Sequence, residues 1–481
     1  MGKFHSSVSR RDFMKGLGLA GAGLGVASSA SPVFHDMDEV ISSVTLRKLP
    51  WYVNEREAEN LTVEVDWDKK ERYDKRKFTV VSPTEAERRV QIQLENIKAK
   101  WTTPNTGMTA KDYAFFAGSA SDAIGASVPL TKGDATLMYT FGGTTQPGGY
   151  NYKQLGLPRW SATPEENLKM VTAVLRFWGA QDVGAHEINE KTQKVFYSAD
   201  TGGRPYTFAD VDNASSDSSH ACLIPNKAKT VLTWVVPMSR VGQYSAPDGF
   251  NILNKVSMGI GYSMGDIIQN RILSFLGALG YLSISRNCGG MNVAHGNLAG
   301  LGEHGRLDYL VNMDYGANVR YTDFVVTDLP IASTKPIDAG IWKFCQTCKK
   351  CAEMCPSGAI PIEGDPSYTI EHPESNGYGL KSYHVNYDNC HPYRGNPGSV
   401  VNGGCGICQN VCVFSKMEGG NIHEVIKATV GTTDVFNSFF RQMDDFFGYG
   451  EFKQADEFWD TMPNTYGTFV PWGRGNSMPG K

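Results

Sequence analysis

Eight of the ten cysteines in this 481-residue chain have the spacing of iron–sulfur ligands. The first four follow the pattern C-x2-C-x2-C-x3-C-P, which runs from Cys345 to Pro356. In such a run the first three thiolates bind one cube and the fourth binds a neighbouring cube. A second set, from Cys390 to Cys412, supplies the remaining ligands, so the spacing predicts two [4Fe-4S] clusters and single-electron transfer.

The ligand assignment is predicted to cross between the two sets. One cluster is bound by Cys345, Cys348, Cys351 and Cys412, and the other by Cys355, Cys390, Cys405 and Cys408. A zinc site or a disulfide framework is the alternative. Zinc sites rarely combine three cysteines with a fourth followed by proline, and disulfide scaffolds belong to short chains. Cys222 and Cys288 remain and are predicted to be buried free thiols.

The start of the chain has the form of a twin-arginine export signal. Ser9-Arg10-Arg11-Asp12-Phe13-Met14-Lys15 precedes a mildly apolar stretch from Gly16 to Ala30, and small residues indicate cleavage near Ala30. Such a signal exports proteins that are already folded, which suits cofactors inserted in the cytoplasm. A chance Arg-Arg pair before an apolar run is the alternative.

Composition describes an ordinary globular protein, with 41% hydrophobic and 20% charged residues. A net charge of −4 provides no basic field for nucleic acid, so no nucleic-acid partner is expected. After the leader, the sequence contains no uninterrupted apolar run of the ~20 residues that a transmembrane helix needs.

Helices and short strands alternate through the middle of the chain, which indicates an α/β or α+β core. Thr163-Pro-Glu-Glu166 is a capping box that begins a helix ending near Gly179. The β-branched run from Thr230 to Val236 predicts a buried strand. Further helices are predicted at 83–100 and 257–279, and further strands at 282–285 and 319–326.

Five regions follow from this pattern. They are a signal peptide at 1–30, an N-terminal region packing on the core at 31–162, a central core at 163–335, a double-cluster domain at 336–415 and an aromatic-rich tail covering the core at 416–481.

Two core motifs, together with the leader and the cysteines, resemble the catalytic subunits of respiratory reductive dehalogenases. The motifs are Ala-Gly-Leu-Gly-Glu-His-Gly-Arg at 299–306 and the run from Tyr315 to Ile331. The resemblance covers roughly Thr163 to Ser415 plus the leader. It implies an α+β protein, with a nitroreductase-like α/β corrinoid-binding core and a ferredoxin-like double [4Fe-4S] domain.

The corrinoid cofactor follows from this resemblance alone. The Asp-x-His-x-x-Gly motif, which supplies a cobalt ligand in other corrinoid proteins, is absent, and neither His295 nor His304 has the required Asp two residues earlier. The family holds its corrinoid base-off, without that ligand. The resemblance suggests cofactor contacts in the glycine-rich motif, at Gly300, Gly302, His304 and Gly305.

The resemblance also implies a catalytic group made of a proton-donating tyrosine, an arginine beside it and an asparagine. By position these are Tyr262, Arg320 and Asn287. A guanidinium beside a phenol stabilises the phenolate left after proton donation. Tyr281 is the rival tyrosine, and pairing of Arg320 with an acid such as Asp323 is the alternative to its catalytic role.

The implied function is reductive dehalogenation of a small organohalide, with a chlorinated alkene or alkane favoured. Electrons would pass from a respiratory donor through both clusters to the corrinoid cobalt. The exported protein would lie on the outer face of the cytoplasmic membrane, held by a small integral-membrane anchor. The alternatives are an epoxyqueuosine-reductase-like corrinoid enzyme, which acts on tRNA in the cytoplasm, and an electron-transfer subunit of a membrane oxidoreductase.

Overall fold

The computed structural model describes residues 49–77, 83–109, 112, 138–141, 144–147, 158–244, 252–372, 377–394, 405–415 and 421–460. The predicted leader lies outside these residues, as do the aromatic residues Tyr466 and Trp472 of the tail. Within the described ranges, no helix combines the length and the apolar character that a bilayer span requires.

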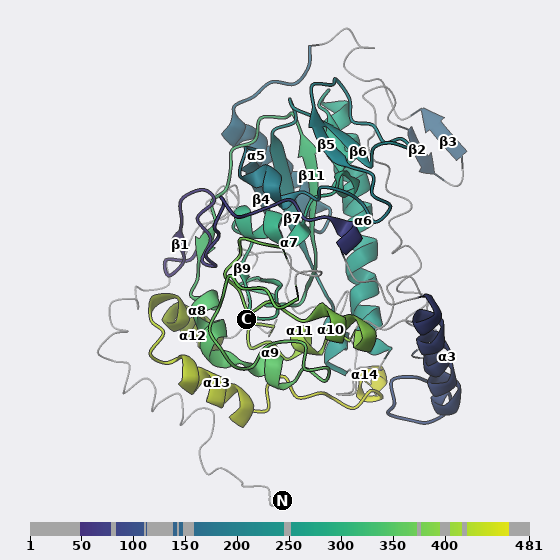
Figure 1. Ribbon diagram of the computed structural model, residues 1–481, viewed down its shortest axis with the longest axis vertical. Coiled ribbons are helices and arrows are strands. Elements are labelled where there is room, and N and C mark those ends of the chain that lie inside the picture. Colours follow the sequence, from purple (N-terminus) through teal and green to yellow (C-terminus); the bar gives the residue numbers. More distant parts are fainter. Residues whose placement is uncertain are drawn as a thin grey trace, which may run out of the picture. The chain divides into compact units, whose positions relative to one another are not determined.

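A four-stranded antiparallel sheet forms the centre of the core, in the order β4–β7–β11–β8 (Figure 1). The strands are β4 Asp182–Glu187, β7 Thr230–Pro237, β8 Ser283–Ser285 and β11 Val319–Thr327. The β-branched run of β7 is buried along nearly its whole length, as predicted, because β7 lies between β4 and β11. Antiparallel pairing throughout this sheet makes the core α+β.

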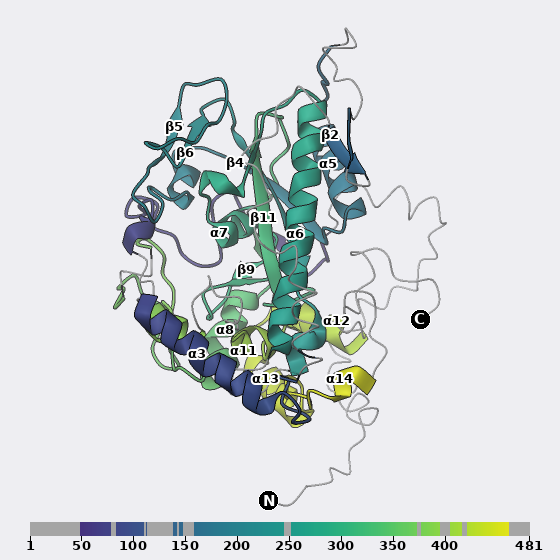
Figure 2. The ribbon, with the colours of Figure 1, turned by 90° about the vertical axis from the view of Figure 1, so that its right-hand side faces the viewer.

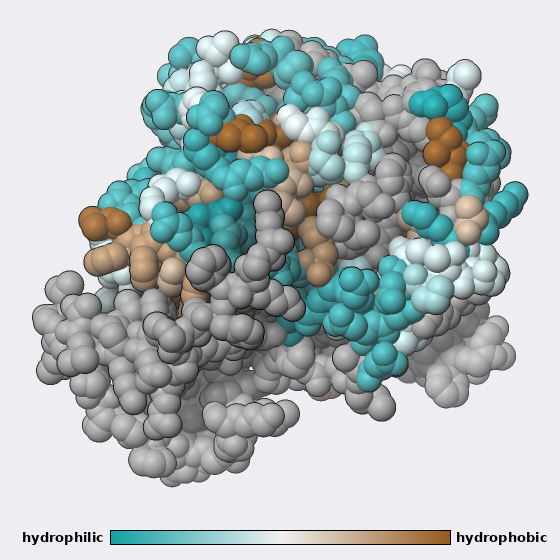
Figure 3. All heavy atoms as spheres, turned by 90° about the horizontal axis from the view of Figure 1, so that it is seen from below, coloured by the Kyte–Doolittle hydropathy of each residue, from teal (hydrophilic) through white to brown (hydrophobic). Residues whose placement is uncertain are grey.

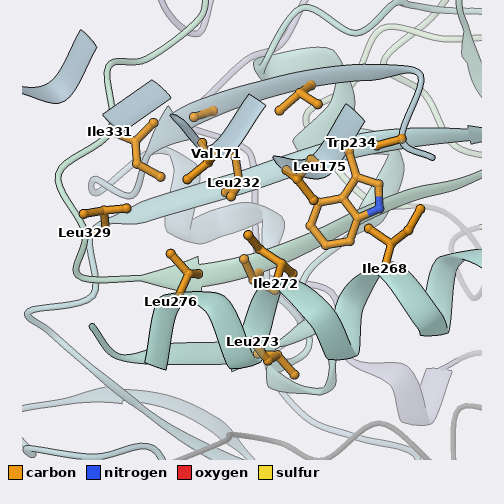
Figure 4. Packing of buried hydrophobic residues seen from close by; sticks show 14 of the residues in the cluster. Val171, Leu175, Leu232, Trp234, Ile268, Ile272, Leu273, Leu276, Leu329 and Ile331 are labelled. Carbon is orange, nitrogen blue, oxygen red and sulfur yellow. The ribbon is translucent and has the colours of Figure 1, made fainter. Parts of the chain in front are cut away.

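Two helices, α5 Pro164–Phe177 and α6 Leu253–Ala278, pack against one face of the sheet. The predicted capping box starts α5: the Thr163 hydroxyl accepts from the Glu166 N–H, and the Glu166 carboxylate accepts from the Thr163 N–H at 2.9 Å. Leu175, Trp234 and Ile272 meet in the apolar layer between helices and sheet (Figure 4). Figure 2 shows α6 running alongside β11.

The other face of the sheet is covered by α7 Asn292–Leu298 and by loops. Phe196 and Phe324 lie in this second apolar cluster. The described N-terminal segment contacts the same side, where the Arg72 guanidinium donates to the Tyr206 carbonyl at 2.6 Å. This segment also adds β1 Asn54–Glu55, which pairs with β12 Ile337–Asp338.

The remaining elements are short, apart from α3, which has the predicted bounds Pro83–Lys100. They are η1 Lys75–Lys77, β2 Met138–Phe141, β3 Thr144–Pro147, η3 Thr192–Val195, β5 Tyr206–Ala209, β6 Cys222–Pro225, η4 Arg240–Tyr244, η5 Arg286–Cys288, β9 Glu303–His304, β10 Leu310–Val311 and α14 Glu457–Asp460.

The cysteine-rich region is built from short helices joined by loops. These are α8 Ile341–Cys348, α9 Lys350–Glu353, α10 Tyr387–Arg394 and α11 Ile407–Asn410. Each is about one or two turns long, so the region depends on loop geometry and on its ligands more than on regular secondary structure.

The described part of the tail packs on the cysteine-rich region and, farther along, on the core. Its helices α12 Asn421–Thr432 and α13 Asn437–Phe446 pack mainly on α8 of the cysteine-rich region, through Val430, Phe440 and Phe344. Farther along, Ala455 joins a core cluster with Leu253. Phe446, at the end of α13, is 58% exposed. On the face of the molecule drawn in Figure 3, apolar residues lie in separate groups among hydrophilic ones.

Candidate functional site

Tyr262 and Arg320 form a direct hydrogen bond between α6 and β11. The Arg320 Nη2 donates to the Tyr262 hydroxyl oxygen, and the guanidinium carbon lies 4.6 Å from the centre of the phenol ring. Since a guanidinium has no acceptor, the phenol must be the acceptor in this bond. The hydroxyl hydrogen of Tyr262 is therefore not used by this bond.

Two backbone features bring Arg320 to this position. A β-bulge interrupts the β11–β7 register between Val319 and Tyr321. The bulge changes the direction in which the Arg320 side chain points. On α6, Gly261 leaves room for it: a Cβ at position 261 would lie only 2.5 Å from the Arg320 Cβ. The close helix–strand approach therefore requires glycine at this point.

Asp323 and Tyr281, the two alternatives, bond to other groups. Asp323 accepts from Arg286 at 3.1 Å and not from Arg320. The rival Tyr281 donates its hydroxyl to the Trp160 carbonyl at 2.7 Å, and Arg159 stacks on its ring. Tyr281 follows the C-terminal end of α6. The helix rises about 24 Å between Tyr262 and Ala278, so the two tyrosines lie far apart.

Asn287 is exposed in the middle of η5, and its N–H donates to the Ser285 hydroxyl at 3.4 Å. Its neighbour Arg286 contacts both α6 and β11 through Asp266 and Asp323. The structure thus connects Asn287 to the two elements that carry Tyr262 and Arg320, through the preceding residue.

The eight predicted cluster ligands fall into two neighbouring groups. Burial raises the pKa of the Cys351 thiol well above its usual range, and repulsion from Cys345, Cys408, Cys412 and Cys348 raises it further. For Cys408, burial is again the main cause of a raised pKa, and the neighbours that add to it are Cys405, Cys390, Cys355 and Cys412. Each of these two thiols has its three predicted partners among its neighbours, and Cys408 and Cys412 also adjoin the other group. The crossed assignment stays a prediction.

The donor set fits two iron–sulfur cubes. Burial raises the pKa of five of these thiols, Cys345, Cys348, Cys351, Cys408 and Cys412, so that each is costly to ionise on its own, and iron would hold each as a thiolate. Among the described residues, no three Cys, His, Asp or Glu side chains converge on a position for one metal ion. In a cube each cysteine binds a different iron, so its four ligands stand apart around the cluster.

Both cysteine groups are attached to the elements that carry the candidate catalytic pair. The Ser415 N–H donates to the Cys412 carbonyl at 2.8 Å, and the Ser415 hydroxyl accepts from the N–H of Ala317 at 3.1 Å, two residues before β11. In the other group, the Asn254 side chain, in the first turn of α6, donates to the Cys405 carbonyl at 2.8 Å. Gly406, with φ +62°, has no room for a Cβ against Asn254.

The predicted corrinoid contacts lie on and beside the β9–β10 hairpin. A Cβ on Gly302 would lie 2.5 Å from the Val311 carbonyl oxygen, and one on Gly305 would lie 2.6 Å from the Val311 side chain. Gly300 has φ +69°. The buried His304 Nε2 lies 3.0 Å from the Ser382 hydroxyl and 2.9 Å from Asp308. Hairpin packing therefore accounts for the glycines, and their contact with a corrinoid stays a prediction.

Three other residues have internal partners or are buried. His295 is fully buried, with its Nδ1 2.9 Å from the His186 Nε2. Cys222 and Cys288 are buried free thiols, as predicted. Burial raises the pKa of the Cys222 thiol to about 12.

The sequence did not indicate the buried network beside the catalytic pair, formed by Asp266, Gln269, Arg286 and Asp323. Its members come from three separate segments of the chain. The one local sign in the sequence was Gly261, which is not part of the network but lies nearby on α6. A glycine inside an apolar helix commonly marks a close approach of another element. Burial, opposed by Arg286, raises the pKa of Asp323 to about 7.

Comparison with known proteins matches two family profiles. Residues 48–331 match the profile described as reductive dehalogenase subunit, and residues 344–415 match a 4Fe-4S double cluster binding domain. The first match covers more than half of the chain and begins upstream of the motifs that carried the resemblance. The chain therefore belongs to the reductive dehalogenase family and contains a double [4Fe-4S] cluster domain.

Characterised relatives agree with this family. The chain is 29% identical to the chloroethene reductive dehalogenase of Dehalococcoides mccartyi strain VS, over 95% of this chain and 97% of that one. It is 30% identical to the tetrachloroethene reductive dehalogenase of Sulfurospirillum multivorans, over 73% and 72% of the two chains. The chain is thus an enzyme of a class that acts on carbon–halogen bonds.

Solved structures share the fold. The structure titled "Reductive dehalogenase structure suggests a mechanism for B12-dependent dehalogenation" matches with a TM-score of 0.52 and 16% identity, over 83% of this chain and 50% of that chain. This chain therefore spans about half the length of that neighbour. At this identity the match speaks for the fold only.

Proposed function

We propose that this protein reductively dehalogenates a small chlorinated alkene, or an alkane, at a corrinoid held base-off beside the Tyr262–Arg320 pair. The observation that carries the proposal is the hydrogen bond between these two residues, in a family that acts on carbon–halogen bonds. In this proposal the core that holds the corrinoid is nitroreductase-like. The chlorinated ethenes of the relatives' names are the favoured substrates.

The reaction replaces a halogen by hydrogen, so it consumes two electrons and one proton and releases one halide ion. Tyr262 supplies the proton from its hydroxyl hydrogen, which its bond with Arg320 does not use. The guanidinium then faces the phenolate oxygen and stabilises its negative charge. Asn287 lies one residue from Arg286 and orients the substrate or the phenol from η5.

The electrons enter singly through the two clusters bound by the eight cysteines. When bound, the corrinoid supplies the redox-active cobalt that passes these electrons to the carbon–halogen bond. The residues that support its placement are the glycine-rich segment with Gly300, Gly302, His304 and Gly305. The protein's own contribution is to attach both cysteine groups to the start of α6 and to the segment before β11, through the hydrogen bonds of Asn254 and Ser415.

One experiment tests this function as a whole. The protein is loaded anaerobically with corrinoid, iron and sulfide, and its absorption spectrum and iron content are measured. Chloride release from trichloroethene and tetrachloroethene is then followed with reduced methyl viologen as electron donor. We expect a corrinoid spectrum, about eight irons and chloride release that depends on both cofactors. Loaded protein that releases no halide from any chlorinated alkene or alkane would refute the proposal.

We further propose that the protein performs this reaction as the last step of organohalide respiration, on the outer face of the cytoplasmic membrane. The leader around Arg10 and Arg11 supports export, and the partners are a small integral-membrane anchor and an upstream respiratory electron donor. Changing both arginines to lysine is expected to leave the precursor, with its cofactors, in the cytoplasm. Unchanged export in cell fractionation would show that the leader is misassigned.

A further inference from the structure

A buried ion network lies directly beside the candidate catalytic pair. The Arg286 guanidinium donates from Nη2 to the Asp266 carboxylate and from Nη1 to Asp323 Oδ2 at 3.1 Å. The side chains of Arg286, Asp266 and Asp323 are 12%, 4% and 0% exposed. One arginine thus bridges two buried carboxylates that come from different elements.

Gln269 completes the network. Its amide donates to Asp323 Oδ1 at 2.7 Å and to the Phe324 carbonyl at 3.1 Å, and its oxygen accepts from Arg286 at 3.3 Å. The network therefore joins α6, β11 and η5. Because an arginine fork bonds two partners at fixed angles, it specifies how these three elements are placed relative to one another.

Each candidate catalytic residue lies next to one member of this network. Asp266 comes four residues after Tyr262, one turn along the same face of α6. Arg286 directly precedes Asn287. On β11, Asp323 comes three residues after Arg320, and both side chains face α6. In a regular strand this odd spacing would put them on opposite faces, and the bulge after Val319 brings them to the same face.

The charge of the network points to a specific role. Two carboxyl groups share one guanidinium, and all three groups are largely removed from water. Such a network gains little stability over well-packed apolar side chains, because desolvation offsets the attraction between the charges. What it provides is a unique arrangement of the groups that it connects.

We propose that Asp266, Arg286 and Asp323 are positioning residues, which hold Tyr262, Arg320 and Asn287 in register for proton delivery. The proposal rests on the proposed function, since it assigns these residues to that site. They act through the candidate residues. Loss of the network is therefore expected to lower turnover while substrate affinity and cofactor binding are kept.

The test compares Arg286→Lys with a matched control, Arg159→Lys. Arg159 also pairs with an aspartate, Asp328, at 2.9 Å, just beyond the other end of β11, and its side chain is 40% exposed. Lysine keeps the charge but cannot bridge two carboxylates as a planar fork does. We expect Arg286→Lys to lose about 10²-fold in kcat, the size of effect that misplaced reacting groups produce, with an almost unchanged KM. Arg159→Lys should match the wild type.

A second variant, Asp323→Asn, keeps the shape of the side chain. It provides a separate test if Arg286→Lys fails to fold. The charged groups that face Asp323 are Asp266 on α6 and Arg286 on η5, and β7 places Trp234 opposite it. Since burial raises the pKa of Asp323 to about 7, its bond to Arg286 strengthens as it ionises. We expect wild-type kcat to rise with pH through this range, and the rise to be lost in Asp323→Asn.

The measurements are kcat and KM for chloride release from trichloroethene, corrinoid and iron content, and the pH profile of kcat. Wild-type kcat for Arg286→Lys at equal cofactor loading would overturn the proposal. So would a pH profile of Asp323→Asn identical to that of the wild type, because a purely structural network would leave the profile unmoved. Failure of the proposed function is recognised separately, because the loaded wild-type protein would then release no chloride.

Discussion

The cluster domain and the α6–β11 contact hold their functional groups in opposite ways. In the cluster domain, the ligands come in short local runs on helices of one or two turns, such as α9 and α11. At the α6–β11 contact, Tyr262 and Arg320 are separated by 58 residues and meet across a long helix and a bulged strand. One site is built from sequence spacing, and the other from packing.

This difference predicts how each site responds to mutation. A cluster ligand is held by its own bond to iron, so its loss removes a cofactor and leaves the other cluster in place. The catalytic pair depends on supports that do no chemistry, such as Gly261, and small changes in those supports are expected to move the reacting groups. The following predictions test this contrast.

The largest effect is expected for cluster ligands. Cys351→Ser should lose the cluster bound by Cys345, Cys348, Cys351 and Cys412, so iron should fall from about eight to about four per chain. Cys405→Ser should lose the other cluster, and both variants should lose viologen-driven turnover. Iron analysis and electron paramagnetic resonance check this. The control, Cys222→Ala, should keep all its iron, and loss of both clusters in either variant would contradict independent sites.

A smaller effect is expected from Gly261→Ala. The added methyl group would lie 2.5 Å from the Arg320 Cβ, so the strand or the side chain must shift. We expect about a 10²-fold loss of kcat with iron and corrinoid content unchanged. The control is Ser263→Ala, on the same turn of α6, which removes atoms and adds none. Equal turnover of the two variants would show that Arg320 does not need this close contact.

The smallest effect concerns stability and pH. The unfolded chain releases the Asp323 proton near its ordinary pKa of 3.8, whereas the folded protein keeps it up to about 7. The contribution of Asp323 to the free energy of unfolding is therefore fully present below pH 3.8, and it is lost as the pH rises through about 7. Asp323→Asn should remove this fall, which amounts to roughly 1–4 °C in Tm. Thermal unfolding at several pH values checks it, with Asp328→Asn expected to follow the wild type.

Local signals in the sequence located the regular elements well. The capping box at Thr163 and the β-branched run of β7 predicted their elements correctly, because the residues that favour each element lie within it or at its end. Helix α6 begins four residues before the predicted Ser257, at Leu253, where no side chain caps it. Strand β4, Asp-Val-Gly-Ala-His-Glu, was not predicted, because it has little β propensity and is held by pairing with β7.

The site was predictable in part, and the limit is physical. The family resemblance indicated Tyr262 and Arg320, and the structure brings them into contact. The network of Asp266, Arg286 and Asp323 leaves no local pattern, because its members meet only when α6, η5 and β11 are assembled. The bulge that turns Arg320 towards α6 is likewise a property of the strand pair and not of one segment.

The central claim is that Tyr262 delivers the proton to the dehalogenated product. The measurement is kcat for chloride release from trichloroethene by Tyr262→Phe, with reduced methyl viologen and with corrinoid and iron equal to the wild type. Only the hydroxyl is removed, so we predict a loss of about 10²–10⁴-fold, while Tyr281→Phe, whose hydroxyl bonds the Trp160 carbonyl, keeps near wild-type turnover. Wild-type turnover by Tyr262→Phe would contradict the claim, and loss of activity in Tyr281→Phe instead would assign the proton to the other tyrosine.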